Sequence, residues 1–106
     1  MNESIQIFME YKVKEENIAE YESLMKRILT TLRDYDATDI EWFVASDQPH
    51  LYVEMFKMPT KSHYHALKKL RCDEEHHLFG QLIPYIEGGA KKIHCWAFQK
   101  KESLRW

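Results

Sequence analysis

Residues 40–58, IEWFVASDQPHLYVEMFKM, hold two short runs of strand-forming residues separated by a turn. In residues 40–45 and again in residues 51–58, apolar side chains recur with the period of a half-buried strand. Between the runs, Ser46-Asp47-Gln48-Pro49 supplies turn chemistry, because proline fixes φ and the Ser and Asp side chains can bond the nearby backbone. The stretch is therefore predicted to be an antiparallel β-hairpin.

A helical region is predicted directly after the hairpin, over residues 60–86. Pro59 stops the strand, and Thr60 is a suitable N-cap for the helix. The polarity of the chain then rises, and Asp73 could cap a renewed helix. We expect either one helix with a bend or two consecutive helical segments, with Pro84 lowering the regularity near the end.

A strand and a helix are predicted before the hairpin. Residues 5–13, IQIFMEYKV, alternate in the same way as the hairpin runs and predict the first strand. Asn17 followed by Glu20 resembles a capping box, and apolar residues then recur at helical spacing to about Asp34. This segment is predicted to be an amphipathic helix.

The last strand is predicted at residues 92–99, KIHCWAFQ, after Gly88-Gly89 ends the second helical region. The element order is then strand-helix-strand-strand-helix-strand. We predict a single α+β domain over residues 1–106 with the ferredoxin-like βαββαβ order, a four-stranded antiparallel sheet and two helical regions on one face. Residues 100–106 are predicted to form a mobile charged tail.

Composition limits the classes of protein to which the chain can belong. Of its 106 residues, 44% are apolar and 30% are charged, which is typical of a folded domain rather than a disordered chain. The net charge of −2 is spread along the sequence, so a nucleic-acid partner is not predicted. Apolar runs are too short for a membrane span, and we expect a cytoplasmic protein. Cys72 and Cys95 are expected to be free thiols.

The sheet is predicted to have two unlike faces, one covered by the helices and one open. The set assigned to the covered face is mainly aliphatic and consists of Ile5, Ile7, Met9, Ile40, Trp42, Val44, Leu51, Val53, Met55, Ile93, Cys95 and Ala97. The set assigned to the open face is rich in aromatic side chains and consists of Gln6, Phe8, Glu10, Glu41, Phe43, Tyr52, Glu54, Phe56, His94, Trp96 and Phe98.

The aromatic members of the open face predict a binding surface. They are Phe8, Phe43, Tyr52, Phe56, Trp96 and Phe98. At about 25 cal/mol per Å² of apolar surface, leaving them in water would forgo several kcal/mol of burial. No third helix remains in the sequence to cover them. We therefore expect a homodimer formed through the open face, and the same six residues are candidates for binding a hydrophobic small molecule.

This pattern resembles the dimeric α+β barrel superfamily, in which two ferredoxin-like subunits pack sheet to sheet. Residues 64–86 followed by GGAKKIHCWAFQ resemble the antibiotic-biosynthesis-monooxygenase-like group, where a long second helical region precedes the last strand. The resemblance implies the fold, and it implies an activity among small cofactor-free oxygenases, heme-degrading enzymes or proteins without assigned activity.

The heme-degrading branch of this group uses an Asn on the first strand with a Trp and a His on the second helical region. In this sequence His76-His77 lies where the His is expected, but Leu67 stands near the Trp position and Glu10-Tyr11 near the Asn position. The match disfavours heme degradation, and no cofactor is predicted. His77 remains a candidate acid-base group from the resemblance alone.

Polar residues on the aromatic open face are the candidate catalytic groups, namely Glu10, Glu41, Glu54 and His94. A carboxylate among aromatic rings can act as a general base, and an imidazole can serve likewise. The alternative is structural, with these groups paired to Lys12, Lys57 or one another. Of these, Glu10, Glu54 and His94, together with His77, are the predicted catalytic residues.

Helical spacing of other polar residues raises the question of a metal site. Cys72 with His76, or Asp73 with His77, would each share a helix face as an i, i+4 pair. Neither pair has a third ligand in the sequence, so no metal site is predicted.

Two functions from different classes remain open. The first is a cofactor-independent monooxygenase-like or proton-transfer enzyme acting on a hydrophobic molecule. The second is a non-catalytic dimer that binds a small ligand or a partner. The sequence contains no phosphate loop, nucleophile elbow or H-E-x-x-H motif, which disfavours phosphoryl transfer, serine hydrolysis and zinc-dependent hydrolysis.

Overall fold

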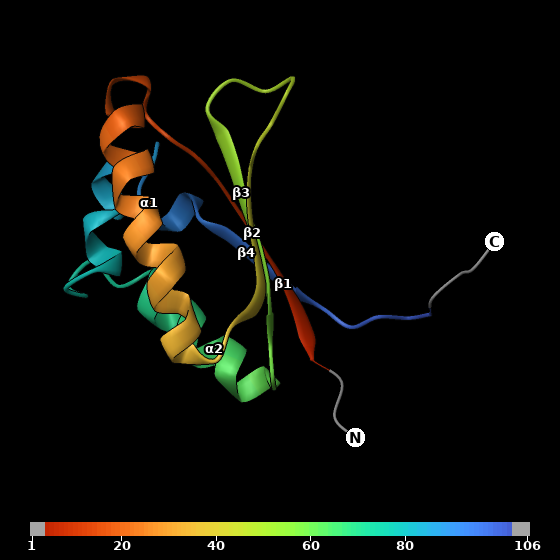
Figure 1. The fold of residues 1–106 in the computed structure, drawn as a ribbon. Coiled ribbons are helices and arrows are strands. Elements are labelled where there is room, and N and C mark those ends of the chain that lie inside the picture. The colour runs from red at the N-terminus through yellow and green to blue at the C-terminus, as the bar shows by residue number, and fades with distance from the viewer. Residues whose placement is uncertain (1–3, 103–106) are drawn as a thin grey trace.

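The computed structural model describes residues 4–102, which form one sheet covered on one side by helices (Figure 1). The helical elements are η1 Glu15–Asn17, α1 Ile18–Leu32, η2 Arg33–Tyr35, α2 Lys61–Arg71, η3 Phe79–Gln81, η4 Ile83–Tyr85 and η5 Ala90–Lys92, where η marks a 3-10 turn. The strands are β1 Ile5–Lys12, β2 Thr38–Val44, β3 Leu51–Met58 and β4 His94–Phe98. The predicted βαββαβ order and α+β class are confirmed.

The four strands form an antiparallel sheet in the order β2-β3-β1-β4. β1 is central, and its residues alternate between the helix-covered core and the open face. α1 contributes to the same core, since it buries Tyr21, Leu24, Met25, Ile28 and Leu32 at helical spacing. Figure 1 shows the sheet edge-on, with both α-helices on the same side of it.

The second helical region differs from the prediction. α2 begins where expected, because the Thr60 hydroxyl accepts a hydrogen bond from the His63 backbone N–H at 3.2 Å. It ends at Arg71, and the chain continues through turns and two 3-10 turns rather than a renewed α-helix. Asp73 accepts a bond from the Glu75 N–H at 2.9 Å, so its side chain closes a local turn instead of capping a helix.

The other predicted elements shift by a few residues. Asn17 stands at the N-cap of α1 as expected, but its side chain makes no capping hydrogen bond. β4 begins at His94 because residues 90–92 form a 3-10 turn. Gly88 and Gly89 both have positive φ, at 85° and 75°, which glycine adopts without the steric cost of a side chain, and they end the second helical region as predicted. Of the tail predicted at 100–106, residues 103–106 lie outside the described residues, and residues 100–102 have no regular secondary structure.

The face assignment of β3 was wrong. Tyr52, Glu54 and Phe56 face the helices and are at most 5% exposed, whereas Leu51, Val53 and Met55 lie on the open face. The register fixes this orientation, since Glu54 pairs with the core residue Met9 on one side and with Trp42 on the other. Hydropathy favours the aliphatic residues for the core, but Glu54 is accommodated there by an ion pair with Arg71.

The face assignment of the other strands holds, with two exceptions at strand ends. Val44 is 58% exposed near the hairpin turn, and Ala97 is exposed near the end of β4, although both were expected under the helices. The helices do not extend over these corners of the sheet.

Candidate functional site

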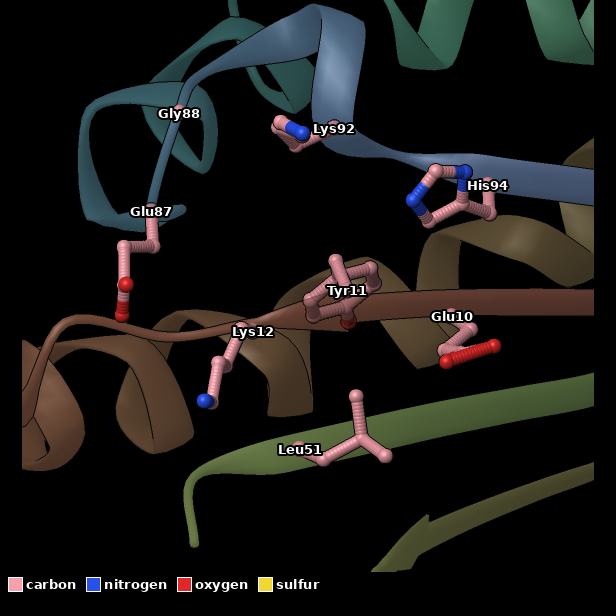
Figure 2. A pocket seen from close by; sticks show the side chains of 8 residues that line it. All are labelled: Glu10, Tyr11, Lys12, Leu51, Glu87, Gly88, Lys92 and His94. Carbon is pink, nitrogen blue, oxygen red and sulfur yellow. The ribbon is translucent and has the colours of Figure 1, made fainter. Parts of the chain in front are cut away.

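Two of the predicted catalytic residues, Glu10 and His94, meet on the open face. They are directly opposite each other in the β1–β4 register, and residues paired in this way project from the same face of a sheet. Glu10 is half-buried and His94 is exposed. Both line a pocket of about 380 Å³ (Figure 2).

The pocket exists because the chain before β4 leaves the sheet and returns. The β1–β4 pairing begins at Glu10 and His94, and further along β1 the next contact is the bridge from Val13 to Ile86. Between these two points, the segment of residues 87–93 is not paired with β1. A hydrogen bond from the Glu87 N–H to the Lys12 carbonyl, at 2.8 Å, holds the start of this segment against the sheet.

The lining of the pocket is mixed in charge. It consists of Glu10, Tyr11, Lys12, Leu51, Glu87, Gly88, Lys92 and His94. In Figure 2, Glu10 and His94 lie at one end of the pocket and Lys12 and Glu87 at the other, with Lys92 across the pocket from Lys12, on the segment before β4. An imidazole, two carboxylates and two ammonium groups therefore surround one small volume. Such a set can exchange a proton with a ligand and neutralise a negative charge on it.

An apolar hollow continues from the pocket along the same two strands. Phe8 pairs with Trp96 and Gln6 pairs with Phe98, and these are the next two pairs on the same face after Glu10 and His94. Phe8, Trp96 and Phe98 line a hollow of about 340 Å³. The His94 and Trp96 rings are nearly parallel, with centroids 6.0 Å apart. A flat apolar group could therefore lie beside the polar pocket.

Much of the open face is exposed to solvent. Phe43, Trp96 and Phe98 have exposed fractions of 44%, 44% and 52%. Of the six predicted ligand-binding aromatics, these three and Phe8 lie on this face, while Tyr52 and Phe56 are buried beneath the helices. The open face is therefore less aromatic than predicted, with Leu51, Val53 and Met55 in their place.

Glu54, the third predicted catalytic residue, lies on the opposite side of the sheet. Its carboxylate accepts hydrogen bonds from Arg71 Nη1 and Nη2, each at 2.7 Å, and neither side chain is exposed. The Tyr11 hydroxyl also donates to Glu54 Oε2 at 2.5 Å. Glu54 therefore follows the structural alternative, in which the glutamate is paired with a basic residue. Its partner is Arg71 rather than the expected Lys12 or Lys57.

Tyr11 connects this ion pair to a set of buried aromatic side chains. Its hydroxyl lies 2.8 Å from that of Tyr21, which in turn accepts a hydrogen bond from Trp42 Nε1 at 3.0 Å. Burial, and then the negative charge of Glu54, raises the pKa of both phenols well above its ordinary value. Burial alone would lower the pKa of Arg71, but the adjacent Glu54 carboxylate raises it instead. Both phenols are therefore neutral and Arg71 is charged.

Arg71, Tyr11 and Tyr21 are not among the predicted site residues. The available signal was a charged residue in an apolar stripe, since Tyr64, Leu67 and Arg71 recur at helical spacing in α2 and all three are buried. A basic residue at a core position implies a buried acid elsewhere in the chain. That inference would have placed Glu54 in the core.

His77, the fourth predicted catalytic residue, lies away from the pocket. It is exposed in the segment between α2 and η3, where its ring stacks on that of His76 with centroids 4.6 Å apart. His76 Nδ1 accepts hydrogen bonds from the backbone N–H groups of Leu78 and Phe79, at 3.1 and 3.0 Å. Because this segment is not helical, the expected i, i+4 pairs do not share a helix face. Within residues 4–102, no three His, Cys, Asp or Glu side chains are arranged to hold a metal ion.

Lys57 pairs with Asp39 at 3.2 Å, not with the candidate catalytic groups. No helix in the described part of the chain has the length and apolar character needed to cross a membrane.

Comparison with known proteins supports the fold. The sequence matches no family model and no curated protein. An antibiotic biosynthesis monooxygenase crystal structure superposes with a TM-score of 0.69 and 17% identity, covering 92% of this chain and 99% of that one. A conserved Methanosarcina mazei protein gives a TM-score of 0.71 with 19% identity over 92% and 93% of the two chains. A NIPSNAP family protein from Agrobacterium tumefaciens gives 0.72 with 16% identity over 96% and 90%.

These structures define the class of fold to which the chain belongs. It is the α+β fold of the antibiotic-biosynthesis-monooxygenase-like and NIPSNAP proteins, matched over nearly the whole chain. The fold that the sequence resemblance implied is therefore confirmed.

Proposed function

We propose that the pocket at Glu10 and His94 binds a small molecule with an acidic C–H group and removes a proton from it. The observation that carries the proposal is the direct cross-strand pairing of a carboxylate and an imidazole in a pocket of about 380 Å³. Histidine is the side chain best suited to accept a proton near neutral pH. His94 is the base, and Glu10 stabilises the imidazolium that forms.

The lysines at the pocket supply the second requirement of this chemistry. Removing a proton from carbon beside a carbonyl leaves an enolate, whose negative charge must be neutralised. Lys12 and Lys92 both line the pocket and can place an ammonium group near the enolate oxygen. The aromatic hollow at Phe8, Trp96 and Phe98 accommodates the apolar part of the same molecule.

Molecular oxygen is the proposed co-reactant, which makes the reaction a cofactor-independent monooxygenation. The carbanion transfers electrons to O₂, one oxygen atom enters the carbon as a carbonyl, and the other leaves as water. A CH₂ group and O₂ thus give C=O and H₂O, with all four electrons supplied by the substrate. The antibiotic biosynthesis monooxygenase of the same fold makes oxygenation the first chemistry to test.

A suitable probe is 1,8-dihydroxyanthrone, whose C10 methylene protons are lost on enolisation and whose oxidation gives the anthraquinone. Without oxygen, the protein should accelerate exchange of these protons in D₂O, followed by NMR. In air, it should accelerate oxygen uptake and quinone formation. His94→Gln should lower both rates by about 10²- to 10⁴-fold, the usual contribution of a general base.

Glu41→Gln is the matched control, because Glu41 is an exposed carboxylate on the same face outside the pocket. Its rates should equal those of the unmodified protein. Exchange that survives in His94→Gln, or that does not exceed the rate in buffer, would refute the proposed base. Exchange without oxygen uptake would leave proton transfer and remove the monooxygenase step.

We also propose that the open face joins two copies of the chain in a homodimer. Phe43, Trp96 and Phe98 lie on the open face with exposed fractions between 44% and 52%, and exposed apolar side chains of this kind mark interaction sites. A twofold axis lets the same face serve both copies. Light scattering should give the mass of a dimer at micromolar concentration, and Phe43→Glu should shift it towards the monomer.

In the second candidate function, the chain is a non-catalytic dimer and the open face serves only as its interface. In such a dimer the partner would cover the pocket at His94. Reaction of His94 with diethyl pyrocarbonate, located by mass spectrometry, distinguishes the two. Modification of His94 in the intact dimer supports an accessible pocket. Protection in the dimer together with reaction in the Phe43→Glu monomer would favour the non-catalytic alternative.

A further inference from the structure

Four aromatic side chains form a continuous path beneath the helices, on the side of the sheet opposite to the open face. The ring centroids of Tyr11 and Tyr21 are 5.8 Å apart, and those of Tyr21 and Trp42 are 5.9 Å apart. Tyr52 is 4.5 Å from Tyr21 and 6.0 Å from Trp42. The path therefore crosses the domain from β1 through α1 to β2 and β3, with no gap between rings larger than 6.0 Å.

Each phenol on this path has a hydrogen-bonded route for its proton. The single hydrogen of the Tyr11 hydroxyl is donated to Glu54, so the Tyr21 hydroxyl donates to Tyr11. A proton leaving Tyr21 can therefore pass to Tyr11 as the proton of Tyr11 passes to Glu54. The Tyr52 hydroxyl donates to Glu22 Oε2 at 2.6 Å, and Glu22 is exposed. Tyrosine gives up an electron readily only when an acceptor takes its proton at the same time.

The two ends of the path lie at different surfaces. Tyr11 follows Glu10 on β1 and lines the pocket from the helix-covered side of the sheet, where it is 1% exposed. Trp42 is half-buried on β2, an edge strand of the sheet. An electron vacancy that arises at the pocket can therefore reach the protein surface through rings in near contact.

We infer that Tyr11, Tyr21 and Trp42 form a radical-transfer path that carries oxidising equivalents from the pocket to the edge of the sheet. The oxidant is a partially reduced oxygen species or another one-electron oxidant. It removes one electron from Tyr11, and the phenolic proton moves to Glu54. The products are a neutral Tyr11 phenoxyl radical, a protonated Glu54 and the reduced oxidant. Tyr21 then gives an electron and its phenolic proton to Tyr11 along the hydrogen bond between their hydroxyls, which leaves a neutral Tyr21 radical. Trp42 in turn gives an electron and its Nε1 proton to Tyr21, so that a neutral Trp42 radical is formed at the edge of the sheet and Glu54 stays protonated.

This inference goes beyond the proposed proton transfer and does not depend on it. Glu54 suits the role because Arg71 holds its carboxylate with two hydrogen bonds while leaving Oε2 in contact with Tyr11. A network with only a structural role would need the hydrogen bonds, including the one from Trp42 to Tyr21, but it would not need the rings to lie in near contact from β1 to the edge strand.

The test generates a strong one-electron oxidant by flash photolysis of tris(bipyridyl)ruthenium with a cobalt(III) quencher. Transient absorption and freeze-quench EPR should detect a neutral tyrosyl radical. Because the proton stays inside the protein, the rate of its formation should not depend on buffer concentration. Tyr11→Phe should remove most of this signal, and Trp42→Phe should prolong its lifetime. Tyr35→Phe is the control, since Tyr35 packs on Phe79 outside the path.

Several results would overturn the inference. An unchanged tyrosyl spectrum in Tyr11→Phe would place the radical on another residue. A formation rate that rises with buffer concentration in the unmodified protein would show that the proton goes to solvent, and this measurement needs no variant to fold. Loss of the signal in Tyr35→Phe would likewise exclude the path. Because none of these readouts uses a substrate, failure of the pocket chemistry leaves the test intact.

Discussion

Arg71 and Glu54 form a two-pronged ion pair in the core, with Nη1 and Nη2 each 2.7 Å from a different carboxylate oxygen. The pair joins the last residue of α2 to the middle of β3, and neither side chain is exposed. The guanidinium carbon also lies 5.3 Å from the centroid of the Phe79 ring. One interaction therefore connects the sheet, the second helix and the 3-10 segment that follows it.

Replacing Arg71 by methionine should destabilise the domain by about 3–5 kcal/mol, because it leaves the Glu54 carboxylate buried without its counter-charge. Urea unfolding followed by circular dichroism measures the change. The double replacement Arg71→Met with Glu54→Leu should recover most of the loss, since it removes both buried charges and keeps apolar volume.

Lys57→Met serves as the comparison for an exposed ion pair. Lys57 lies 3.2 Å from Asp39, and the two side chains are 38% and 68% exposed. The expected cost is about 0–1 kcal/mol. If Arg71→Met costs no more than Lys57→Met, the buried pair does not stabilise the fold as argued.

The succession of elements was predictable because each depends on local signals. Turn residues at 46–49, the Thr60 cap and the positive-φ glycines at 88–89 act within a few residues of the elements they limit. The renewed helix after Asp73 was not correctly predicted. There the side chains of Asp73 and His76 bond the backbone in turns, and these bonds compete with helix formation.

The candidate site was predictable only in part, because strand alternation identifies residues that share a face but does not show which face the helices cover. Glu10 and His94 follow from alternation on β1 and β4, whose registers are regular. Glu54 was assigned to the wrong face because alternation gives two sets of residues and hydropathy must choose between them. Hydropathy gave the wrong face because the buried Glu54 carboxylate is hydrogen-bonded to Arg71, which lies 17 residues further along the chain. The pocket itself depends on the path of residues 87–93, which no local pattern defines.

Acidification should weaken the fold at the start of η3. Burial, and then the charge of His77, lowers the pKa of His76 from its ordinary value of 6.5. Its neutral Nδ1 accepts two backbone hydrogen bonds, and the protonated ring has no lone pair there to accept them. The contribution of His76 to stability is therefore complete above pH 6.5 and is lost as the pH falls through the lowered pKa.

Urea unfolding at about pH 7 and about pH 5 measures this contribution. The His76→Ala variant should be less stable than the parent at the higher pH, by about 0.5–1.5 kcal/mol for each hydrogen bond lost. The difference should shrink at the lower pH. His65→Ala, a change at an exposed histidine of α2, should show no such difference, and an equal pH dependence in parent and His76→Ala would contradict the role of the ring.

Alkaline titration should separate the buried phenols from the rest. Burial raises the pKa of Tyr11, Tyr21 and Tyr64, and burial together with the Glu22 hydrogen bond raises the pKa of Tyr52 to about 12. At about pH 10.5, tyrosinate absorbance should therefore be lower in the folded protein than in urea. Since the raised pKa values favour the neutral form, their stabilisation is complete below pH 10.0 and is lost as the pH rises. Equal absorbance in both conditions would show that these phenols are accessible to solvent.

Alkylation should distinguish the two cysteines, because the thiolate is the reactive form. Burial raises the pKa of Cys95 to about 11, whereas Cys72 is only half-buried. Iodoacetamide at about pH 8 should therefore modify Cys72 well before Cys95, as measured by peptide mass spectrometry. In denaturing urea the two rates should become similar, which controls for differences in peptide detection. Equal labelling of both cysteines in the folded protein would mean that β4 opens readily, and the pocket beside His94 would then lack a rigid wall.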